Sequence, residues 1–267
     1  MIYLDTKMMR RDLLSMGFSA KSAGVHMGGS LSLVEIMAVL YGMVMHFDPQ
    51  NPEAEDRDRL ILSKGHGVLC QYAALKQLGL YSDDDLKTCK QNESIISAHP
   101  SRNLKHGIEF SSGSLGQGLS LGVGVALSLR KKKLERSPIV YVVMGDGECD
   151  EGSVWEAAMA AAQFKLDNLV AIIDRNHLQY DGNTELVIGL ENFKDKWESF
   201  GWKCINCNGH DENSLKQSFE SVHENKPMCV IADTVKGKGI SFMENNSSWH
   251  NGVLTQKLYE DALKELS

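Results

Sequence analysis

The sequence has no excess of basic residues and no long apolar run. Its 28 lysines and arginines stand against 35 aspartates and glutamates, a formal net charge of −7, which does not favour a nucleic acid or an anionic membrane as partner. No stretch approaches the roughly 18 consecutive apolar residues of a membrane-spanning helix. The basic residues near the N-terminus are not followed by an apolar segment, so no signal peptide is predicted.

A cysteine framework is also missing, because the six cysteines are scattered along the chain. Cys204 and Cys207 have the spacing of redox and zinc motifs, but no second pair and no nearby pair of histidines completes a zinc site. The surrounding segment "WKCINCN" is better explained as a buried strand. These absences predict a reduced, cytoplasmic protein.

Apolar segments alternate with helical segments along the chain. The segments "RLILS", "PIVYVVM", "NLVAIID" and "MCVIAD" are apolar throughout, which is typical of parallel strands covered on both faces by helices. Helices are expected at about 3–17, 33–46, 67–78, 191–200, 211–223 and 254–265, and in the segments "SGSLGQGLSLGVGVALSL" and "SVWEAAMAAAQF". With no internal repeat and no linker, the prediction is a single α/β domain over residues 1–267 with a doubly wound, mostly parallel sheet.

One helix start has a recognisable pattern. Ser32 and Glu35 have the spacing of a capping box, and Glu35 is therefore interpreted as a capping acid rather than a catalytic one.

An acidic turn follows one of the predicted strands. Gly145-Asp146-Gly147 comes directly after "YVVM", and 28 further residues lead to Asn176, just after the next strand. Ligands bind beyond the C-terminal ends of such strands, so Asp146 and Asn176 should lie together. Carboxylate and amide oxygens suit a hard cation such as Mg²⁺, which can hold a diphosphate, and Gly147 would let that diphosphate approach the backbone. An ordinary turn with solvated acids is the alternative.

Four histidines lie in loops that contain Gly or Ser: His26, His66, His99 and His250. A single loop histidine is usually a surface residue, but four such loops, two of them placed after strands, are a less ordinary pattern. Imidazoles can hydrogen-bond hydroxyls and move protons near neutral pH. The other histidines are interpreted as structural: His46, His106, His177, His210 and His223.

The Gly-Asp-Gly turn and the later asparagine resemble the diphosphate motif of thiamine-diphosphate enzymes. The segments "LSKGHG", "SSGSLGQGLS", "GDGECDEGSVWEAA", "LVAIIDRNHLQYDG", "TVKGKGISFMEN" and "WHNG" together resemble transketolase. The likeness runs from about residue 10 to the C-terminus, in the family's order. It implies the thiamine-diphosphate-binding (diphosphate domain) fold, as in transketolases that are split into two polypeptides.

The resemblance implies roles for single residues. Mg²⁺, or Ca²⁺ or Mn²⁺ in its place, would be bound by Asp146, Asn176 and the backbone carbonyl of Leu178. The cofactor-binding residues would be His66, Gly113, Ser114, Leu115, Gly147, Asn176, Lys236 and His250. The catalytic residues, which contact sugar hydroxyls and assist proton transfer, would be His26, His99 and His250. Glu151 and Glu156 match acids that lie between the two active sites of a dimer.

Two positions depart from the family pattern. His26 stands between Val25 and Met27 where the family usually has Gly-His-Pro, and His99 follows Ala98 where glycine is common. These departures bear on the contacts of the two histidines and not on the fold.

The activity implied by the resemblance is transketolase: transfer of a two-carbon ketol unit from a ketose phosphate, such as a pentose phosphate, to an aldose, with thiamine diphosphate as electron sink. The family's activating glutamate belongs to a second α/β domain, which also holds the sugar phosphate. Only 17 residues follow His250. The resemblance therefore implies a C-terminal partner subunit with the pyrimidine-binding domain and that glutamate, two copies of each forming a heterotetramer.

Several alternatives stay open. The same scaffold serves deoxyxylulose-phosphate synthases, the α subunits of 2-oxo-acid dehydrogenases and transketolases with a specialised ketose. A non-catalytic regulatory subunit that keeps the cofactor-binding fold is a further alternative, because a fold does not determine a function.

Overall fold

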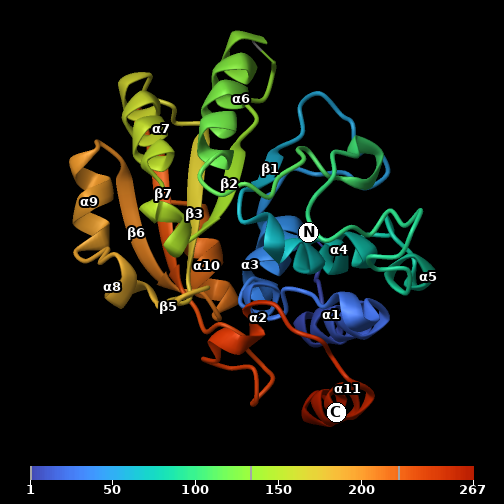
Figure 1. Ribbon diagram of the computed structural model, residues 1–267. Coiled ribbons are helices and arrows are strands. Elements are labelled where there is room, and N and C mark those ends of the chain that lie inside the picture. The colour runs from blue at the N-terminus through green and yellow to red at the C-terminus, as the bar shows by residue number, and fades with distance from the viewer. Residues whose placement is uncertain (1, 133, 222) are drawn as a thin grey trace.

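A five-stranded parallel sheet forms the centre of the computed structural model, which describes residues 2–132, 134–221 and 223–267 (Figure 1). Its strand order is β1-β2-β3-β7-β6, and every neighbouring pair is parallel. The strands are β1 (Arg59–Leu62), β2 (Val140–Gly145), β3 (Leu169–Arg175), β6 (Lys203–Asn208) and β7 (Met228–Asp233). The predicted strands are thus confirmed, whereas the short antiparallel pair β4 (Leu178–Gln179) and β5 (Gly182–Asn183) was not predicted.

Helices connect the strands and cover both faces of the sheet. They are α1 (Thr6–Ser19), α2 (Gly28–Leu31), α3 (Val34–Val39), α4 (Val68–Gln77), α5 (Asp83–Leu86), α6 (Gly118–Lys132), α7 (Gly152–Gln163), α8 (Thr184–Val187), α9 (Phe193–Ser199), α10 (Glu212–Phe219) and α11 (Gln256–Glu265). A π-helical turn, Leu40–Val44, continues α3. Short 3₁₀ turns lie at Lys21–Ala23, Gly65–Gly67, Leu104–His106, Gly147–Asp150 and Ser247–His250. The helices that the periodicity predicts are present, but the one expected over 112–129 begins only at Gly118, since 112–117 form a loop. The helix expected over 211–223 ends at Phe219, and residue 222 lies outside the described residues. The one-turn helices α2, α5 and α8 are additions.

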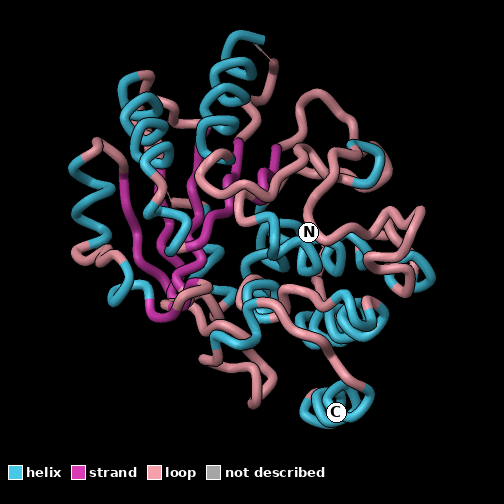
Figure 2. Tube along the Cα trace, in the orientation of Figure 1, coloured by secondary structure: helices cyan, strands magenta, loops and turns pink. Residues whose placement is uncertain are grey.

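Helices lie on both faces of the sheet (Figure 2), and a hydrophobic core lies between the sheet and the helices on each face. Successive side chains of a strand point to opposite faces. Val142 and Met144 of β2 accordingly belong to the core under α6, α7 and α9, while Tyr141 and Val143 belong to the core with α1, α3, α4 and α10. This alternation of wholly buried side chains confirms the doubly wound arrangement.

The strand register brings distant loops to one edge of the sheet. Gly145 of β2 pairs with Asp174 of β3, and Asp174 pairs with Ala232 of β7. The residues that follow these strands, together with the loop after β1, therefore meet at the C-terminal edge. This edge is where ligands bind in open α/β sheets.

The predicted capping box at the start of α3 is wrong. Leu33 is the N-cap residue and makes no side-chain cap. The Ser32 hydroxyl donates instead to Asp174 Oδ2 at 2.6 Å, a charged acceptor within the core. Glu35 is buried, accepts from Arg10 Nη2 at 2.7 Å and lies 2.8 Å from Nδ1 of His210. Both side chains face the protein interior, where their hydrogen bonds to charged partners are stronger than a bond to the backbone N–H groups of the helix end.

The six cysteines are free thiols. Cys204 and Cys207 lie on β6, with Cys204 buried, which confirms that their spacing belongs to a strand. In the described residues, no helix combines the length and the apolar character that crossing a bilayer requires.

Candidate active site

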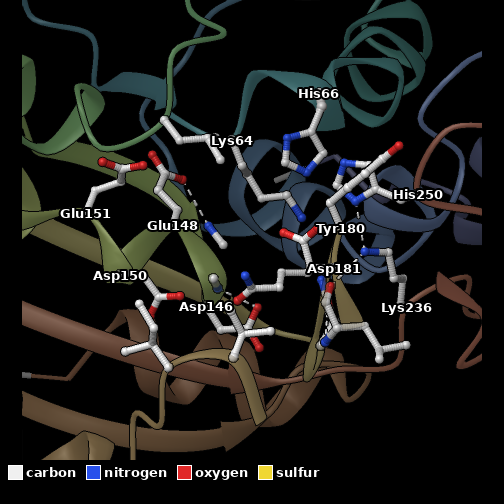
Figure 3. Close-up of a pocket in the computed structure, with 18 residues that line it drawn as sticks. Lys64, His66, Asp146, Glu148, Asp150, Glu151, Tyr180, Asp181, Lys236 and His250 are labelled. Carbon is white, nitrogen blue, oxygen red and sulfur yellow. Dashed lines mark hydrogen bonds between the residues drawn. The ribbon is translucent and has the colours of Figure 1, made fainter. Parts of the chain in front are cut away.

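A pocket of about 510 Å³ lies at the C-terminal edge of the sheet. Four carboxylates lie on one side, and lysine and histidine side chains lie on the other together with Asp181 (Figure 3). The acidic side holds Asp146, Glu148, Asp150 and Glu151. The basic side holds Lys64, His66, Lys236 and His250. A pocket with two oppositely charged sides can hold a cation and an anion next to each other.

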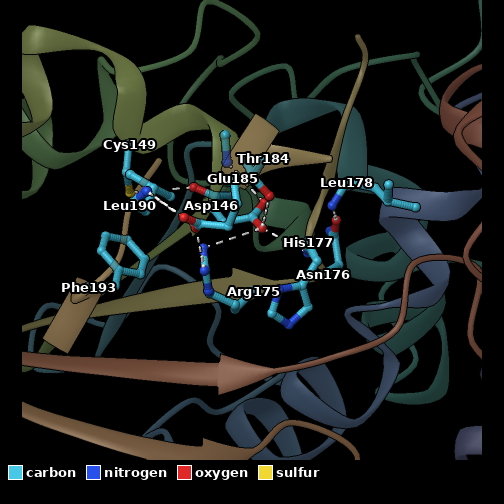
Figure 4. Close-up of polar contacts among 12 residues, drawn as sticks. Asp146, Cys149, Arg175, Asn176, His177, Leu178, Thr184, Glu185, Leu190 and Phe193 are labelled. Atoms are coloured by element: carbon cyan, nitrogen blue, oxygen red, sulfur yellow. Dashed lines mark hydrogen bonds and ion pairs between the residues drawn. The ribbon is translucent and has the colours of Figure 1, made fainter. Parts of the chain in front are cut away.

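Asp146 is the buried carboxylate at the end of β2 (Figure 4). Its Oδ1 accepts from the N–H of Gly147 at 2.9 Å, and its Oδ2 accepts from the N–H of His177 at 2.8 Å and the hydroxyl of Thr184 at 3.0 Å. Burial and the charge of Asp174 raise the pKa of Asp146, although these hydrogen bonds oppose the rise. A carboxylate held in this way is stabilised by a bound cation.

Asn176 and Leu178 line the same pocket as Asp146, and the role of the three as metal ligands stays a prediction. Asn176 donates to Asp174 Oδ2 at 3.1 Å, and its Oδ1 accepts from the N–H of Leu178 at 3.2 Å. The Leu178 carbonyl, however, accepts from Lys236 Nζ at 2.7 Å. A carbonyl oxygen has two lone pairs, so one remains for a cation.

A buried ion pair fixes the floor of the pocket. Asp174 is fully buried and binds the ammonium of Lys64 and the hydroxyls of Ser32 and Thr234. Burial alone would raise the pKa of Asp174, but Lys64 and these hydroxyls lower it. Because Asp174 also accepts from Asn176 Nδ2, the ion pair fixes the orientation of the asparagine amide.

Lys236 and His250 form the basic side of the pocket. Lys236 is buried, and its Nζ lies 3.1 Å from Nδ1 of His250. Burial and the nearby Lys64 lower the pKa of Lys236 to about 8. Burial, followed by Lys236, lowers the pKa of His250 to about 4. A neutral His250 and a charged Lys236 can therefore coexist at neutral pH.

The four histidines that the sequence places in separate loops come together. The ring of His26 lies 5.5 Å from that of His66, 5.6 Å from that of His99 and 5.4 Å from that of His250, centroid to centroid. Burial, then the neighbouring His99, lowers the pKa of His26 to about 4. The convergence is confirmed as geometry, whereas the catalytic roles stay predictions.

A small backbone ladder pins two of these histidine loops together. Val25 and Gly252 exchange hydrogen bonds of 2.9 and 3.0 Å, so Val25, next to His26, and Gly252, two residues after His250, form an antiparallel bridge. Here Val25 and Met27, which depart from the family pattern, are both buried.

Glu148 holds the Gly-rich loop before α6, residues 112–117, against the acidic turn. The sequence reasoning left Glu148 without a role. Its buried Oε1 accepts from the Ser63 hydroxyl and from the N–H of Gly116 at 2.9 Å, and its Oε2 accepts from the N–H of Gly145 at 3.1 Å. One carboxylate therefore joins three segments of the pocket. The position of Glu148 inside the acidic turn was the sequence signal that could have indicated this role.

The other predicted residues lie as follows. Leu115 lines the pocket, as do His66, Gly147, Asn176, Leu178, Lys236 and His250. Gly113 and Ser114 do not line it, and Gly113 lies next to the His99 ring. Glu151 and Glu156 are exposed at α7, and their predicted place between two active sites stays a prediction.

Lys64 and Tyr180 are pocket residues that the sequence reasoning missed. Tyr180 lies edge-on to His250 with ring centroids 5.2 Å apart, and no sequence pattern marks it. Lys64 was present in the motif "LSKGHG", which was the available signal.

The donor set fits a hard cation better than a soft one. Within residues 2–132, 134–221 and 223–267, no three His, Cys, Asp or Glu side chains gather as a metal site, so a cation in this pocket would take amide, carbonyl and ligand oxygens as well as Asp146. Gln179 Oε1 is a buried acceptor without a hydrogen-bond partner and lines the same pocket. An oxygen-rich surface of this kind suits Mg²⁺ with a bound diphosphate.

Comparison with curated proteins identifies relatives of similar length. One of the subunits of apulose-4-phosphate transketolase from Phocaeicola vulgatus is 42% identical over 266 residues, covering 99% of this chain and 93% of that protein. The 6-deoxy-6-sulfo-D-fructose transketolase subunit of a Clostridium species is 41% identical, with coverage of 90% and 88%.

Solved transketolases share the fold over nearly the whole chain. The Leishmania mexicana enzyme superposes with a TM-score of 0.88 at 28% identity, and the Campylobacter jejuni enzyme with 0.86 at 30%. Both likenesses cover 98% of this chain but only 40% and 42% of those longer chains. The family model for the transketolase thiamine diphosphate binding domain matches residues 6–266. The chain therefore belongs to the transketolase family, as its thiamine-diphosphate-binding domain.

Proposed function

We propose that this chain is the N-terminal subunit of a two-subunit transketolase that uses thiamine diphosphate and Mg²⁺ to transfer a ketol unit between sugars. The observation that carries the proposal is the pocket with two charged sides at the ends of β2 and β3. Its acidic turn suits a cation, and its lysines and neutral histidines suit a diphosphate and sugar hydroxyls.

The chain's own residues would divide the work as follows. Asp146, Asn176 and the Leu178 carbonyl would hold the cation, and Lys236 would face the diphosphate. When bound, thiamine diphosphate would supply the electron sink for carbon–carbon bond cleavage. The pKa of His26 is low because of burial, so this imidazole is neutral at pH 7 and can accept a proton from a sugar hydroxyl.

A partner subunit is part of the proposal. The relatives named above as subunits have lengths close to this chain, and the solved transketolases have further chain that this one does not match. We expect the partner to carry the pyrimidine-binding domain with the activating glutamate and the sugar-phosphate site, and to assemble as two copies of each subunit.

A specialised ketose phosphate or sulfonated ketose is the second candidate substrate. The observation that favours it is the pair of relatives, whose names specify apulose 4-phosphate and 6-deoxy-6-sulfo-D-fructose. The residues that would select the acidic group are expected on the partner, so the pocket described above is compatible with either donor.

Reconstitution tests the proposal. The purified chain with thiamine diphosphate and Mg²⁺ is expected to give no ketol transfer, and addition of its partner is expected to give transfer from a panel of ketose phosphates and sulfonated ketoses to aldoses. Full turnover by the chain alone would contradict the partner requirement. Cofactor binding without turnover, in an assembly with a partner that retains its glutamate, would favour a non-catalytic role.

A further inference from the structure

Arg175 is a buried cation at the end of β3 that the proposed function does not use. Its side chain is 5% exposed. Its Nη2 donates to Oε1 of Glu185 and Oε1 of Glu191, both at 2.7 Å, and its Cζ lies 5.2 Å from the centre of the Phe193 ring. Its Nη1 lies 3.9 Å from Asp146 Oδ2. One guanidinium thus faces the proposed metal-site carboxylate and the segment that follows β5 (Figure 4).

That segment, residues 184–191, forms part of the pocket rim, and we name it the rim segment. Val187 and Ile188 line the pocket, and Leu186, Val187 and Ile188 are 86%, 41% and 56% exposed. Three successive apolar side chains with so much exposure gain little from burial within this chain. These three side chains therefore contribute little to holding the rim segment, whereas Leu190 near its end is buried in the core.

Polar contacts hold the rim segment through its first two residues, Thr184 and Glu185. Thr184 is buried, donates its hydroxyl to Asp146 Oδ2 at 3.0 Å, and donates its N–H to the carbonyl of His177 at 3.0 Å. Glu185 accepts from the N–H of Leu190 at 3.1 Å and binds Arg175.

The two ion pairs of Arg175 are not equivalent. The Glu185 side chain is 31% exposed and that of Glu191 is 60% exposed, so solvent screens the second pair more strongly. A guanidinium that is itself buried makes stronger hydrogen bonds than an exposed one. Glu185 is therefore the main contact between Arg175 and the rim segment.

The acidic surroundings make this cation necessary. Burial raises the pKa of Asp150, as do, to a smaller extent, the charges of Asp146, Glu151 and Glu185. These carboxylates repel one another across the turn and the rim segment. Arg175 offsets this repulsion on both sides, because its Nη2 binds Glu185 and its Nη1 lies 3.9 Å from Asp146 Oδ2, at ion-pair distance but without a hydrogen bond.

We propose that Arg175 is a positioning residue that holds the rim segment against the Asp146 turn, so that the pocket wall formed by Val187 and Ile188 exists before any ligand binds. The inference rests on the proposed function for the identity of the ligand, and on the contacts above for the tether itself.

The test uses Arg175→Met, which keeps the length and apolar contact of the side chain and removes its hydrogen bonds. In the cofactor-free chain, amide hydrogen exchange of a peptide spanning 184–191 is expected to increase about tenfold or more, with strand β3 unchanged. In the assembled protein, the Kd for thiamine diphosphate with Mg²⁺ is expected to rise by a similar factor. Arg130→Met is the matched control, since the Arg130 guanidinium donates to the carbonyls of Phe164 and Lys165, away from the pocket.

Two further variants make the result specific. Glu185→Gln should reproduce the local increase in exchange, and the double variant with Arg175→Met should add little to it, because both changes remove the same contact. Arg175→Lys keeps the charge but loses the forked geometry, so an intermediate increase is expected; it also serves if the methionine variant does not fold.

Three outcomes would overturn the inference. They are unchanged exchange of the rim segment in both arginine variants, increased exchange with unchanged cofactor affinity, and increased exchange throughout the sheet, which would indicate a general stabilising role. If the wild-type assembly bound no thiamine diphosphate, the proposed function would fail, while the exchange experiment would still decide whether the tether exists.

Discussion

Replacement of Asp146 by alanine probes the proposed metal site most directly. The Asp146 carboxylate accepts three hydrogen bonds, from Gly147, His177 and Thr184. Each donor left unpaired costs about 1–3 kcal/mol. Removal of a carboxylate that burial and Asp174 disfavour offsets part of this cost. A net loss of about 2 kcal/mol in unfolding free energy is expected, equal to a fall in Tm of roughly 4–8 °C for a domain of this size.

The effect on cofactor binding should be much larger than the effect on stability. Loss of a residue that only supports a metal ligand lowers metal affinity about 10- to 100-fold, so loss of the ligand itself should exceed about 100-fold. The assay is a titration of the assembled protein with thiamine diphosphate, followed by calorimetry, in Mg²⁺ and in EDTA. For Asp146→Ala the two affinities should coincide.

Asp150→Ala is the matched control, because Asp150 lies in the same turn and lines the same pocket. Its Oδ1 has no hydrogen-bond partner, so its removal should cost little stability and preserve the Mg²⁺ dependence. If Asp146→Ala folds with the expected Tm and still binds thiamine diphosphate in an Mg²⁺-dependent way, the assignment of Asp146 as a metal ligand is refuted.

Two further predictions follow from the pKa values of the basic side of the pocket. Lys236 has a pKa of about 8 because of burial and Lys64. A bound diphosphate should raise this pKa, so binding near pH 8.5 should take up a proton. Calorimetry in buffers of different ionisation enthalpy measures the uptake, which Lys236→Met should abolish. The pKa values of His26 and His250 are lowered from 6.5 to about 4. Between these pH values the unfolded chain binds more protons, so the unfolding free energy should fall as the pH drops from 6.5 to 4. Imidazole NMR signals of these two residues that titrate near pH 6.5 would contradict the second prediction.

The sequence predicted the fold because its strongest signals are long and uninterrupted. The strand "NLVAIID" is apolar on both faces, and the structure buries every residue of β3. The elements that were missed are one-turn helices and the two-residue strands β4 and β5, which carry too few residues for a periodic pattern. Their positions follow from tertiary contacts, as the hydrogen bonds of Thr184 illustrate.

Site residues could be predicted where a motif puts a polar side chain directly after a strand. They could not be predicted where a contact between residues distant in sequence determines the role of the side chain. Asp146 and Asn176 could be placed at the pocket because both follow buried strands, while their role as metal ligands stays a prediction. The role of Ser32 was misread because its acceptor, Asp174, lies 142 residues away in sequence. Glu148 and Lys64 stood inside recognised motifs, yet only the folded chain shows that one joins the Gly-rich loop to the turn and the other neutralises a buried carboxylate.

The register between β2 and β3 has a consequence for the number of residues that separate the Gly-Asp-Gly turn from Asn176. The pairing of Gly145 with Asp174, rather than the length of the connection, sets the separation of Asp146 and Asn176. That connection runs through α7 and turns near Lys165 and Asp167, which are exposed, and the entropy of closing a longer loop there grows slowly. Insertion of a few residues after Lys165 should therefore preserve the pocket, whereas a shift of β3 by one residue would turn its side chains to the opposite face. The interval of 28 residues thus reflects the dimensions of a crossover helix and not a requirement of the chemistry.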